Sequence, residues 1–426
     1  MTEAGIIVIG GGQAGAALSA KLRSNGYAGP LTLIGAEPVP PYQRPPLSKG
    51  YLLGEMALDR LFLRGPDWYQ GQDISLMLGH AATAIDAVAQ TVTVAGKLLA
   101  YDELALTTGA VPRRLPAAVG GDLQGVYVVR TLADIDAMAP EFAPGKRLVV
   151  IGGGYIGLEA AAVAAKRGVS VAVVEMAPRI LQRVAAPQTS DYFRTAHQAH
   201  GVEVIEGVGL DRLLGSGHVS GARLTDGREL AADFVIAGVG IVPDVALAEA
   251  AGVAVENGIR TDDLGRTSVP HIWAAGDCAS FPWRGGRLRL ESVQNAIDQA
   301  ECVADNMMGE GREYRPTPWF WSDQYDVKLQ IAGLNTGYDR IVTRGSADRA
   351  EGAPVSFWYY RGDQVLAVDA MNDPRAYMIG KRLLEMGRSA DPAVIADASR
   401  DLKPLLKSAG YQHGGRSPLP WERGGG

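Results

Sequence analysis

Two stretches of the chain repeat the same order of apolar and polar positions. Each begins with a continuous apolar run, passes through a glycine-rich turn into an alanine-rich segment with helical spacing, and ends in a second apolar run. Short continuous apolar runs are typical of strands that are buried on both faces of a parallel sheet. The pattern therefore predicts two βαβ units, with strands at 5–9 and 31–34 around a helix at 16–25, and strands at 147–151 and 170–175 around a helix at 158–167.

The glycine-rich turns of the two units begin at Gly10 and Gly152, a spacing that indicates duplication of a whole domain and not a short repeat. The last part of the chain has a different texture. Apolar runs at 355–360 and 365–368 flank a short polar turn, which predicts a β-hairpin, and a helix is expected at 374–386. The glycine-rich end, residues 411–426, is expected to be disordered.

The composition limits the class of protein. Apolar residues make up 47% of the chain and charged residues 21%, which are ordinary values for a well-packed soluble protein. Glycine accounts for 54 of 426 residues, above the usual ~7%, and gathers in short runs that indicate tight turns. The net charge of −6 gives no basic field for nucleic acid, and no apolar run reaches the ~18 residues of a membrane span. We therefore expect a cytoplasmic protein that binds neither nucleic acid nor a membrane.

Cysteine and histidine are too few and too scattered to build a metal or disulfide framework. The two cysteines, Cys278 and Cys302, are far apart, which excludes a disulfide scaffold, a CxxC redox pair and a cysteine zinc site. The six histidines form no HxxxH or HxH pair, and the closest two, His197 and His200, have no cysteine nearby. We therefore expect no metal site in the protein.

Both glycine-rich turns have the GxGxxG spacing that binds a dinucleotide. In this motif the first glycine makes the turn, the second lets a pyrophosphate approach the backbone, and the third lets helix and strand pack closely. The helix that follows offers unpaired N–H groups and a partial positive charge to the phosphates. One such motif is weak support, but here each follows an apolar strand and opens a helix. The two sets are Gly10, Gly12 and Gly15, and Gly152, Gly154 and Gly157.

The second strand of each unit leads to an acidic residue, Glu37 in the first and Glu175 in the second. A carboxylate at this place accepts hydrogen bonds from the adenosine ribose and repels a 2′-phosphate. No arginine directly follows Glu175, so NADH is favoured over NADPH in the second unit. A solvated carboxylate at a strand end is the alternative, above all for Glu37. Two nucleotide sites in one chain imply two ligands that exchange something, and FAD in the first with NADH in the second is the usual arrangement.

Two further segments are more specific. The loop 41–49 (PYQRPPLSK) and the segment 319–324 (WFWSDQ) resemble those of the oxygenase-coupled NADH–ferredoxin reductases, the putidaredoxin reductase-like branch of the FAD-dependent pyridine nucleotide oxidoreductases. The resemblance covers roughly residues 5–405. Other matching segments are shared with a wider set of two-dinucleotide flavoproteins, and they lie at 101–104, 107–113, 129–132, 238–243, 275–278 and 291–296.

The resemblance implies an α/β fold with two Rossmann-like dinucleotide-binding domains, like those of glutathione reductase, and a C-terminal α+β domain. FAD would be bound by residues 1–112 together with 244–318, and NADH by the inserted residues 113–243. Residues 319–410 would form the C-terminal domain, which covers the flavin and offers a docking face. The protein would be a monomer or a weak homodimer.

The resemblance also implies roles for single residues around the flavin. Asp277 matches the carboxylate on the ribityl chain, although an aspartate before a helix serves equally well as an N-cap. Lys49 matches the lysine near the flavin ring, with a solvated loop lysine as the alternative. Trp321 matches the aromatic residue over the flavin, with a buried core tryptophan as the alternative. The other residues expected at FAD, besides the first glycine set and Glu37, are Ala14, Arg44, Ala82, Thr108, Gly109, Arg130 and Val293.

On the second nucleotide, the resemblance places Glu159 near the nicotinamide. The alternative is that Glu159 only stabilises the dipole of the helix in whose first turn it is expected. Lys49, Glu159 and Trp321 are the expected catalytic residues. Tyr155, Ile156 and Gly240 are expected to contact NADH together with the second glycine set and Glu175.

The implied function is NADH-dependent reduction of FAD, followed by electron transfer to an acidic [2Fe–2S] ferredoxin that serves a cytochrome P450 or a ring-hydroxylating dioxygenase. Residues 41–53 contain no cysteine, unlike the CxxxxC pair of glutathione reductase-type enzymes, so electrons must go directly to an external carrier. Three alternatives stay open: a rubredoxin reductase, a NADH-sensing flavoprotein like the apoptosis-inducing factor group, and, with less support, an oxidase that passes electrons to O₂.

Overall fold

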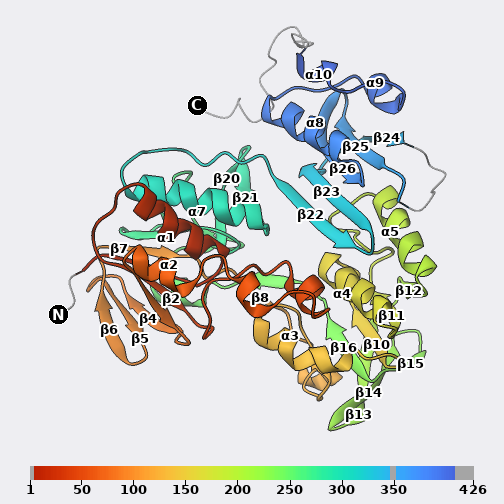
Figure 1. The fold of residues 1–426 in the computed structure, drawn as a ribbon, viewed down its shortest axis with the longest axis horizontal. Coiled ribbons are helices and arrows are strands. Elements are labelled where there is room, and N and C mark those ends of the chain that lie inside the picture. The colour runs from red at the N-terminus through yellow and green to blue at the C-terminus, as the bar shows by residue number, and fades with distance from the viewer. Residues whose placement is uncertain (1–3, 346–351, 408–426) are drawn as a thin grey trace.

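The computed structural model describes residues 4–345 and 352–407. The predicted disordered tail therefore lies outside the described residues. Three five-stranded sheets organise this part of the chain (Figure 1), two of them parallel and one antiparallel. None of the described helices combines the length and the hydropathy that a membrane span requires.

The first sheet is parallel and has the strand order β19-β7-β1-β2-β3. Helices α1 (Gln13–Ser24) and α7 (Val293–Met307) pack together beside it. Its strands β1 and β2 are almost entirely apolar and buried, as the sequence pattern predicts for the first βαβ unit. The strands are β1 (Ile6–Ile9), β2 (Leu31–Gly35), β3 (Ile74–Leu78), β7 (Glu103–Leu106) and β19 (Ile272–Ala274).

The second sheet repeats this arrangement, with the order β12-β11-β10-β16-β9 and all strands parallel. The predicted domain-scale duplication is thus confirmed in three dimensions. The strands are β9 (Val126–Tyr127), β10 (Arg147–Ile151), β11 (Ser170–Glu175), β12 (Glu203–Glu206) and β16 (Phe234–Ala237), and the helices around them are α3 (Leu132–Met138), α4 (Tyr155–Lys166) and α5 (Pro187–Ala199).

Both unit helices begin three residues earlier than the sequence predicted, at Gln13 and not 16, and at Tyr155 and not 158. The reason is that the helix starts inside the glycine motif. Gly12 and Gly154 are the extended N-cap residues, so the last glycine of each motif already lies in the first helical turn.

Each parallel sheet carries a three-stranded antiparallel meander, which follows β3 in the first sheet and β12 in the second. The meanders are β4 (Ala82–Asp86), β5 (Thr91–Val94) and β6 (Lys97–Ala100), and β13 (Leu210–Ser216), β14 (His218–Leu224) and β15 (Glu229–Ala231). A two-stranded ribbon of β8 (Ala110–Pro112) and β17 (Ile241–Pro243) lies where the chain passes from the first sheet to the second and returns. Smaller elements complete the first part: α2 (Pro66–Gly71), α6 (Ala246–Ala250), β18 (Ile259–Arg260), β20 (Ala279–Trp283), β21 (Gly286–Leu288), and short helical turns at Leu47–Tyr51, Leu58–Leu61, Ala117–Val119 and Ala139–Glu141.

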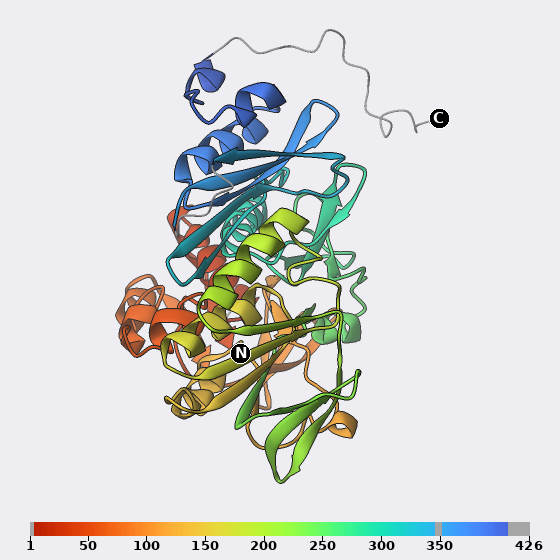
Figure 2. The same cartoon turned by 90° about the vertical axis from the view of Figure 1, so that its right-hand side faces the viewer.

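The third sheet is antiparallel, with the order β22-β23-β26-β25-β24. With its helices it lies at one end of the molecule (Figure 2), and the prediction of a C-terminal α+β domain is confirmed. The predicted hairpin is β25–β26, and the predicted helix is α8. The elements are β22 (Trp319–Gln324), β23 (Val327–Gly333), β24 (Arg340–Gly345), β25 (Val355–Arg361), β26 (Gln364–Met371), α8 (Pro374–Glu385), α9 (Pro392–Ala396) and α10 (Pro404–Lys407).

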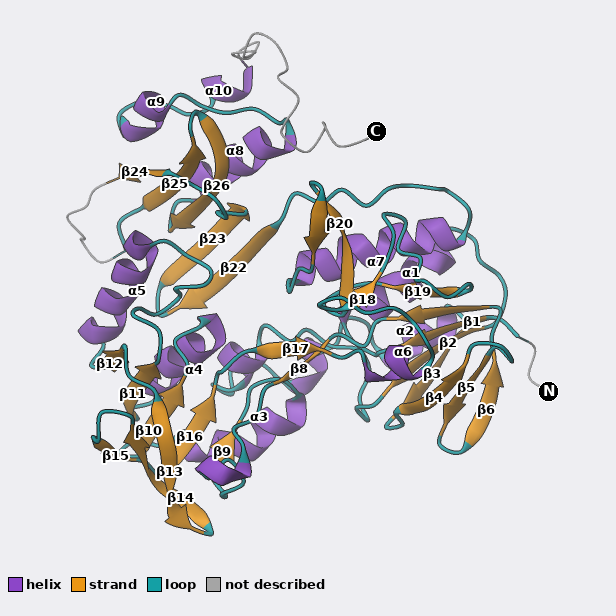
Figure 3. Ribbon diagram, turned by 180° about the vertical axis from the view of Figure 1, so that it is seen from behind, coloured by secondary structure: helices purple, strands orange, loops and turns teal. Residues whose placement is uncertain are grey.

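One apolar cluster joins the three parts of the molecule. It contains Leu47 from the loop after β2, Phe193 from α5, and Leu329 from β23, all of them buried. Helix α5 lies beside the third sheet in both the front and the back view (Figures 1 and 3). Because apolar area buried at a joint resists separation, the three sheets form a continuous packed body around their junction.

A buried carboxyl also ties α5 to the third sheet. Asp369 on β26 is only 1% exposed and accepts hydrogen bonds from Thr189 Oγ1 at 2.7 Å and from the Tyr359 hydroxyl. The Tyr359 oxygen accepts the Ala186 backbone N–H in turn. Burial raises the pKa of Asp369 to about 6, and the two hydrogen bonds only partly oppose this rise.

We predict that Asp369→Asn stabilises the protein in a pH-dependent way. The folded protein keeps the Asp369 proton up to about pH 6, whereas the unfolded chain loses it near pH 3.8, so the stability that this residue contributes falls as the pH rises through that window. The amide should therefore raise the melting temperature at about pH 8, and the gain should shrink towards about pH 4. Thermal melts at both pH values check this, with Asp363→Asn on the exposed hairpin as the control. A gain that grows on acidification would contradict the assignment.

Candidate functional site

A cleft of about 1440 Å³ lies where the three sheets meet, and both glycine loops line it. This volume exceeds the ~300–1,000 Å³ of an ordinary small-molecule pocket. Of the residues predicted to bind FAD, those that line the cleft are Gly10, Gly12, Ala14, Glu37, Arg44, Lys49, Thr108, Gly109, Arg130, Asp277, Val293 and Trp321. All those predicted to bind NADH line it too: Gly152, Gly154, Tyr155, Ile156, Gly157, Glu159, Glu175 and Gly240.

Two predicted FAD residues are not part of the lining. Gly15 is buried in α1, where it lets the helix approach the turn before it. Ala82 begins β4 and packs partly buried against the apolar core of the first sheet. The sequence alone could not separate Ala82 from the lining, because its separation depends on how the meander is placed against the sheet.

The outer glycines of each motif are required by the fold itself. Gly10 has φ +119°, and a Cβ there would lie 2.2 Å from the Thr107 carbonyl oxygen. Gly152 has φ +109°, and its Cβ would lie 2.3 Å from the Gly238 carbonyl oxygen. The third glycines pack on the first ones, because a Cβ on Gly15 or Gly157 would meet the preceding turn at 2.0 or 2.4 Å. A side chain at these positions would displace backbone.

No backbone contact within the described part of the protein requires glycine at the middle position of either motif. A Cβ on Gly12 or Gly154 would meet nothing within 4 Å. Both residues are N-caps without a side-chain hydrogen bond, so the first N–H groups of α1 and α4 have no capping side chain. Open space in front of an uncapped helix N-terminus is what a pyrophosphate needs. We call each glycine-rich turn, together with the helix N-terminus that follows it, a cradle. Both cradles therefore fit a dinucleotide.

The two acidic residues occupy the same place in their units but make different contacts. The Glu37 carboxylate accepts the Tyr42 hydroxyl at 2.6 Å and pairs with Arg44 at 2.8 Å. Glu175 accepts the backbone N–H groups of Gly153 and Ala177, both at 2.7 Å. Glu175 is thus held on its own glycine loop, whereas Glu37 is held by side chains of the loop after β2.

Asp277 follows β19 and faces Arg130, with 3.4 Å between the carboxylate and the guanidinium. Burial raises the pKa of Asp277, and the nearby Arg130 opposes that rise. Burial likewise lowers the pKa of Arg130. The alternative that Asp277 is a helix N-cap is wrong, because strand β20 follows it, and Ser292 caps the helix α7.

The centre of the cleft holds an ion pair between the partly buried Lys49 and the buried Glu159. Lys49 Nζ lies 2.7 Å from Glu159 Oε2, which also accepts the Ser48 hydroxyl at 3.0 Å. The other carboxylate oxygen, Oε1, accepts the Ser322 hydroxyl at 2.8 Å. Glu159 itself is only 3% exposed. It is the fifth residue of α4, beyond the first turn, so the interpretation that it acts only on the helix dipole is wrong.

Aromatic side chains from the third sheet close the cleft. Trp319 and Trp321 are alternate residues of β22 and lie side by side, with 5.6 Å between their ring centroids. Phe320 points to the other face and packs against Tyr155, with the rings tilted and 4.9 Å between their centroids. The Tyr155 hydroxyl is buried and has no hydrogen-bond partner among the residues that the structure describes. A buried orphan hydroxyl beside an uncapped cradle fits a site that is completed by its ligand.

Several residues at or behind the cleft have no counterpart in the sequence prediction. Ser48 and Ser322 lie inside the two specific segments, next to Lys49 and Trp321, and that neighbourhood was the only available indication. Asp369, Arg113 and Arg183 also line the cleft. Arg113 ends the matching segment 107–113, whereas nothing in the local pattern indicated Asp369 or Arg183.

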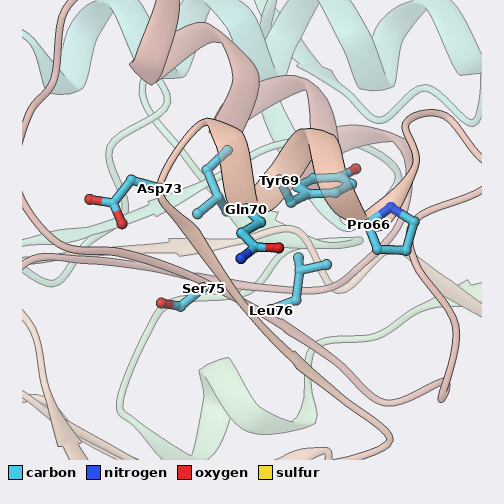
Figure 4. A pocket seen from close by; sticks show the side chains of 7 residues that line it. Pro66, Tyr69, Gln70, Asp73, Ser75 and Leu76 are labelled. Carbon is cyan, nitrogen blue, oxygen red and sulfur yellow. The ribbon is translucent and has the colours of Figure 1, made fainter.

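Outside the cleft the described residues offer little other chemistry. Cys278 is buried and donates to the backbone oxygens of Leu106 and Ala275, while Cys302 is buried elsewhere. The described residues contain no cluster of three metal-binding side chains. A hollow of about 290 Å³ between α2 and β3 (Figure 4) contains none of the cradle residues.

Comparisons with known proteins agree with this geometry. Residues 4–300 match the family model of pyridine nucleotide-disulphide oxidoreductases, and residues 319–406 match the reductase C-terminal domain. A ferredoxin–NAD(P)(+) reductase of Sphingomonas sp is 42% identical over 95% of this chain and 98% of that protein. The reductase in the covalent putidaredoxin reductase–putidaredoxin complex superimposes with a TM-score of 0.91 at 39% identity, over 96% of this chain and 99% of that one. The ferredoxin reductase for the CYP199A2 system from Rhodopseudomonas palustris gives 0.90 at 39%, over 95% and 100%.

We predict that alanine at the two middle glycines separates ligand binding from folding. Gly12→Ala and Gly154→Ala should keep the wild-type melting temperature of the ligand-free protein, because each Cβ points into open space. Gly12→Ala should weaken FAD binding, and Gly154→Ala should raise the KM for NADH, each about tenfold or more, since the methyl group blocks the pyrophosphate. Gly71→Ala, whose Cβ also meets nothing, is the control. Unchanged binding in both variants would show that the cradles are empty turns.

Proposed function

The chain belongs to the pyridine nucleotide-disulphide oxidoreductase family, and on this premise we propose that it is an NADH-dependent flavoprotein reductase that passes electrons through FAD to a [2Fe–2S] ferredoxin. The observation that supports this most strongly is the sharing of one cleft by two uncapped glycine cradles. Two dinucleotides in one space can exchange a hydride, whereas one dinucleotide needs only one cradle. We assign FAD to residues 1–112 with 244–318, NADH to 113–243, and the covering domain to 319–410.

FAD, when bound, accepts a hydride from NADH and delivers the two electrons singly to the iron–sulfur partner. The residues of the chain position and polarise the two ligands. Gly12 and the N-terminus of α1 hold one pyrophosphate, and Gly154 and α4 hold the other. We place Asp277 and Arg130 at the ribityl chain, and the Lys49 ammonium near the flavin ring, where positive charge favours the arrival of a hydride.

We propose NADH and not NADPH as the reductant. Both oxygens of Glu175 are engaged by backbone N–H groups, so its negative charge is fixed at the ribose position and repels a 2′-phosphate. Met176, which follows it, is 77% exposed and offers no positive charge. The cytoplasmic location and the monomer or weak dimer expected from the sequence stay predictions.

We propose that the ferredoxin is acidic and meets a basic surface built from two parts of the molecule. Arg284 in the β20–β21 hairpin is close enough to Arg361, at the turn between β25 and β26, for the two charges to interact. Partial burial and this repulsion together lower the pKa of Arg284. Two like charges held together favour an acidic partner, which relieves the repulsion. The terminal oxygenase served by the ferredoxin would be a cytochrome P450 or a ring-hydroxylating dioxygenase.

We predict that NADH bleaches the flavin of the FAD-loaded protein at least about tenfold faster than NADPH, and that an acidic [2Fe–2S] ferredoxin accelerates NADH turnover. Stopped-flow absorbance and steady-state assays measure both steps. Faster bleaching by NADPH would refute the assignment of Glu175. Turnover that only a rubredoxin accelerates would favour a rubredoxin reductase. Bleaching that no iron–sulfur carrier accelerates would favour a sensing flavoprotein.

We predict that Arg361→Glu lowers kcat/KM for the ferredoxin about tenfold at low salt, because it removes attraction and adds repulsion at the docking surface. The difference should shrink as the ionic strength rises. Arg212→Glu, on the exposed meander β13–β15, serves as the matched charge control. Equal effects of the two substitutions would indicate a response to net charge and would contradict a local docking surface.

A further inference from the structure

A buried chain of hydrogen bonds leads away from Glu159 through the third sheet to α5. From Glu159 it runs to Ser322 on β22, then to Gln324 two residues further on the same strand, at 3.2 Å. Gln324 contacts His197 of α5 at 2.8 Å, and His197 contacts the Tyr325 hydroxyl at 2.9 Å. Ser322, Gln324 and His197 are at most 1% exposed. The chain therefore connects the ion pair in the cleft with the outer helix of the second sheet.

The hydrogen-bonding groups allow one consistent direction. Ser322 has one hydroxyl proton, which it gives to Glu159, so it must accept from the Gln324 amide nitrogen. Gln324 then presents its oxygen to His197, whose Nε2 must carry the proton. The free Nδ1 accepts the Tyr325 hydroxyl. Each donor in the series points towards the Glu159 carboxylate, and burial lowers the pKa of His197 to about 4, which keeps its ring neutral.

The backbone supports the outer end of this chain. Tyr325 sits in the turn between β22 and β23 with φ +58°, a conformation that side chains other than those of glycine, asparagine and aspartate rarely adopt. Its carbonyl accepts the Lys166 ammonium at 3.3 Å, at the C-terminal end of α4, and its ring stacks on His200 at 3.7 Å. The β22–β23 hairpin thus contacts α4 at two places, at Glu159 and at the C-terminal residue Lys166.

We propose that Ser322, Gln324 and His197 are positioning residues, which hold the Glu159 carboxylate against Lys49 and thereby set the distance and the charge between the flavin and nicotinamide sites. This inference rests on the proposed function. The three residues act through Glu159. Hydride transfer needs reacting atoms within about 3–3.5 Å of each other, so a small shift of α4 slows the reaction strongly.

The matched variants are Ser322→Ala, which removes the donor to Glu159, and Gln324→Met, which keeps the volume but breaks the chain one step further out. Tyr360→Phe is the control. It removes a buried hydroxyl from β25 of the same sheet, which donates to the Ala390 carbonyl and is not part of the hydrogen-bond chain. If the loss of any buried hydrogen bond in the third sheet slowed the reaction, Ser322→Ala, Gln324→Met and Tyr360→Phe should all be slower than the wild type.

We expect Ser322→Ala and Gln324→Met each to slow flavin reduction by saturating NADH about tenfold, while the dissociation constant of NADH changes less than about twofold. The double variant should be no slower than either single one, since both break the same chain. The midpoint potential of the bound flavin should become more negative by the same amount in Ser322→Ala, in Gln324→Met and in the double variant, because the Glu159 charge is less neutralised. Tyr360→Phe should change neither quantity.

Several outcomes would overturn the proposal: multiplicative effects in the double variant, an effect of Ser322→Ala without one of Gln324→Met, or unchanged potentials. A separate readout needs no turnover, namely ¹⁵N NMR of the histidine rings between about pH 5 and about pH 8. It should show His197 neutral with its proton on Nε2, and a proton on Nδ1 would refute the donor direction. Bleaching of the wild-type flavin by NADH tests the proposed function, whereas only the ratios of variant to wild type test this inference.

Discussion

The structure depends on the satisfaction of one buried carboxylate. Glu159 lies on α4, the helix that follows the glycine-rich turn of the second sheet. Its hydrogen bonds nevertheless come from Lys49 and Ser48 in the loop after β2 and from Ser322 in the third sheet. A buried charge without these partners would be costly, so the three parts of the molecule must meet at this point. The same contact fixes Lys49, the only cation bonded to Glu159 among the described residues, at the place where we propose that the flavin ring lies.

The two cradles show how one motif serves both the fold and the ligand. The first and third glycines of each set are required by backbone contacts that exist without any ligand, at Gly10, Gly15, Gly152 and Gly157. The middle glycines face only open space, so the fold gives no reason for them and a pyrophosphate does. Because the strand order β3-β2-β1-β7 of the first sheet matches β12-β11-β10-β16 of the second, the two cradles occupy equivalent places, and the junction with the third sheet brings both into one cleft.

Local sequence patterns predicted the central strands, the two cradles and one hairpin, because residues close together in the chain determine these features. The apolar runs identified the central strands, the GxGxxG spacing identified both cradles, and the polar turn at 361–364 identified the hairpin β25–β26. The starts of α1 and α4 were placed three residues late, because the sequence does not show that a glycine motif ends inside the helix. The resemblance identified Lys49 and Glu159 as site residues, and the structure shows them in contact.

The contacts that assemble the site were beyond sequence reasoning. Ser48 and Ser322 reach Glu159 from positions 111 and 163 residues away, and serine carries no pattern that indicates such a partner. Asp369 resembles any other strand residue until its burial and its bond to Thr189, 180 residues away, are known. Ala82, which the resemblance placed at FAD, packs partly buried against the core of the first sheet, and the placement of the meander decides this. Packing between distant segments decides all of these positions.

The central claim is that nicotinamide and flavin meet in the shared cleft with fixed geometry and exchange a hydride directly. The most direct test is rapid anaerobic reduction of the FAD-loaded protein by NADH carrying deuterium on one or the other face of the nicotinamide C4. Our account predicts slower bleaching for one of the two labelled forms and an unchanged rate for the other, because the site presents a single face to the flavin. Equal rates for both labelled forms and unlabelled NADH would show that direct hydride transfer does not limit reduction in this cleft, and would contradict the account.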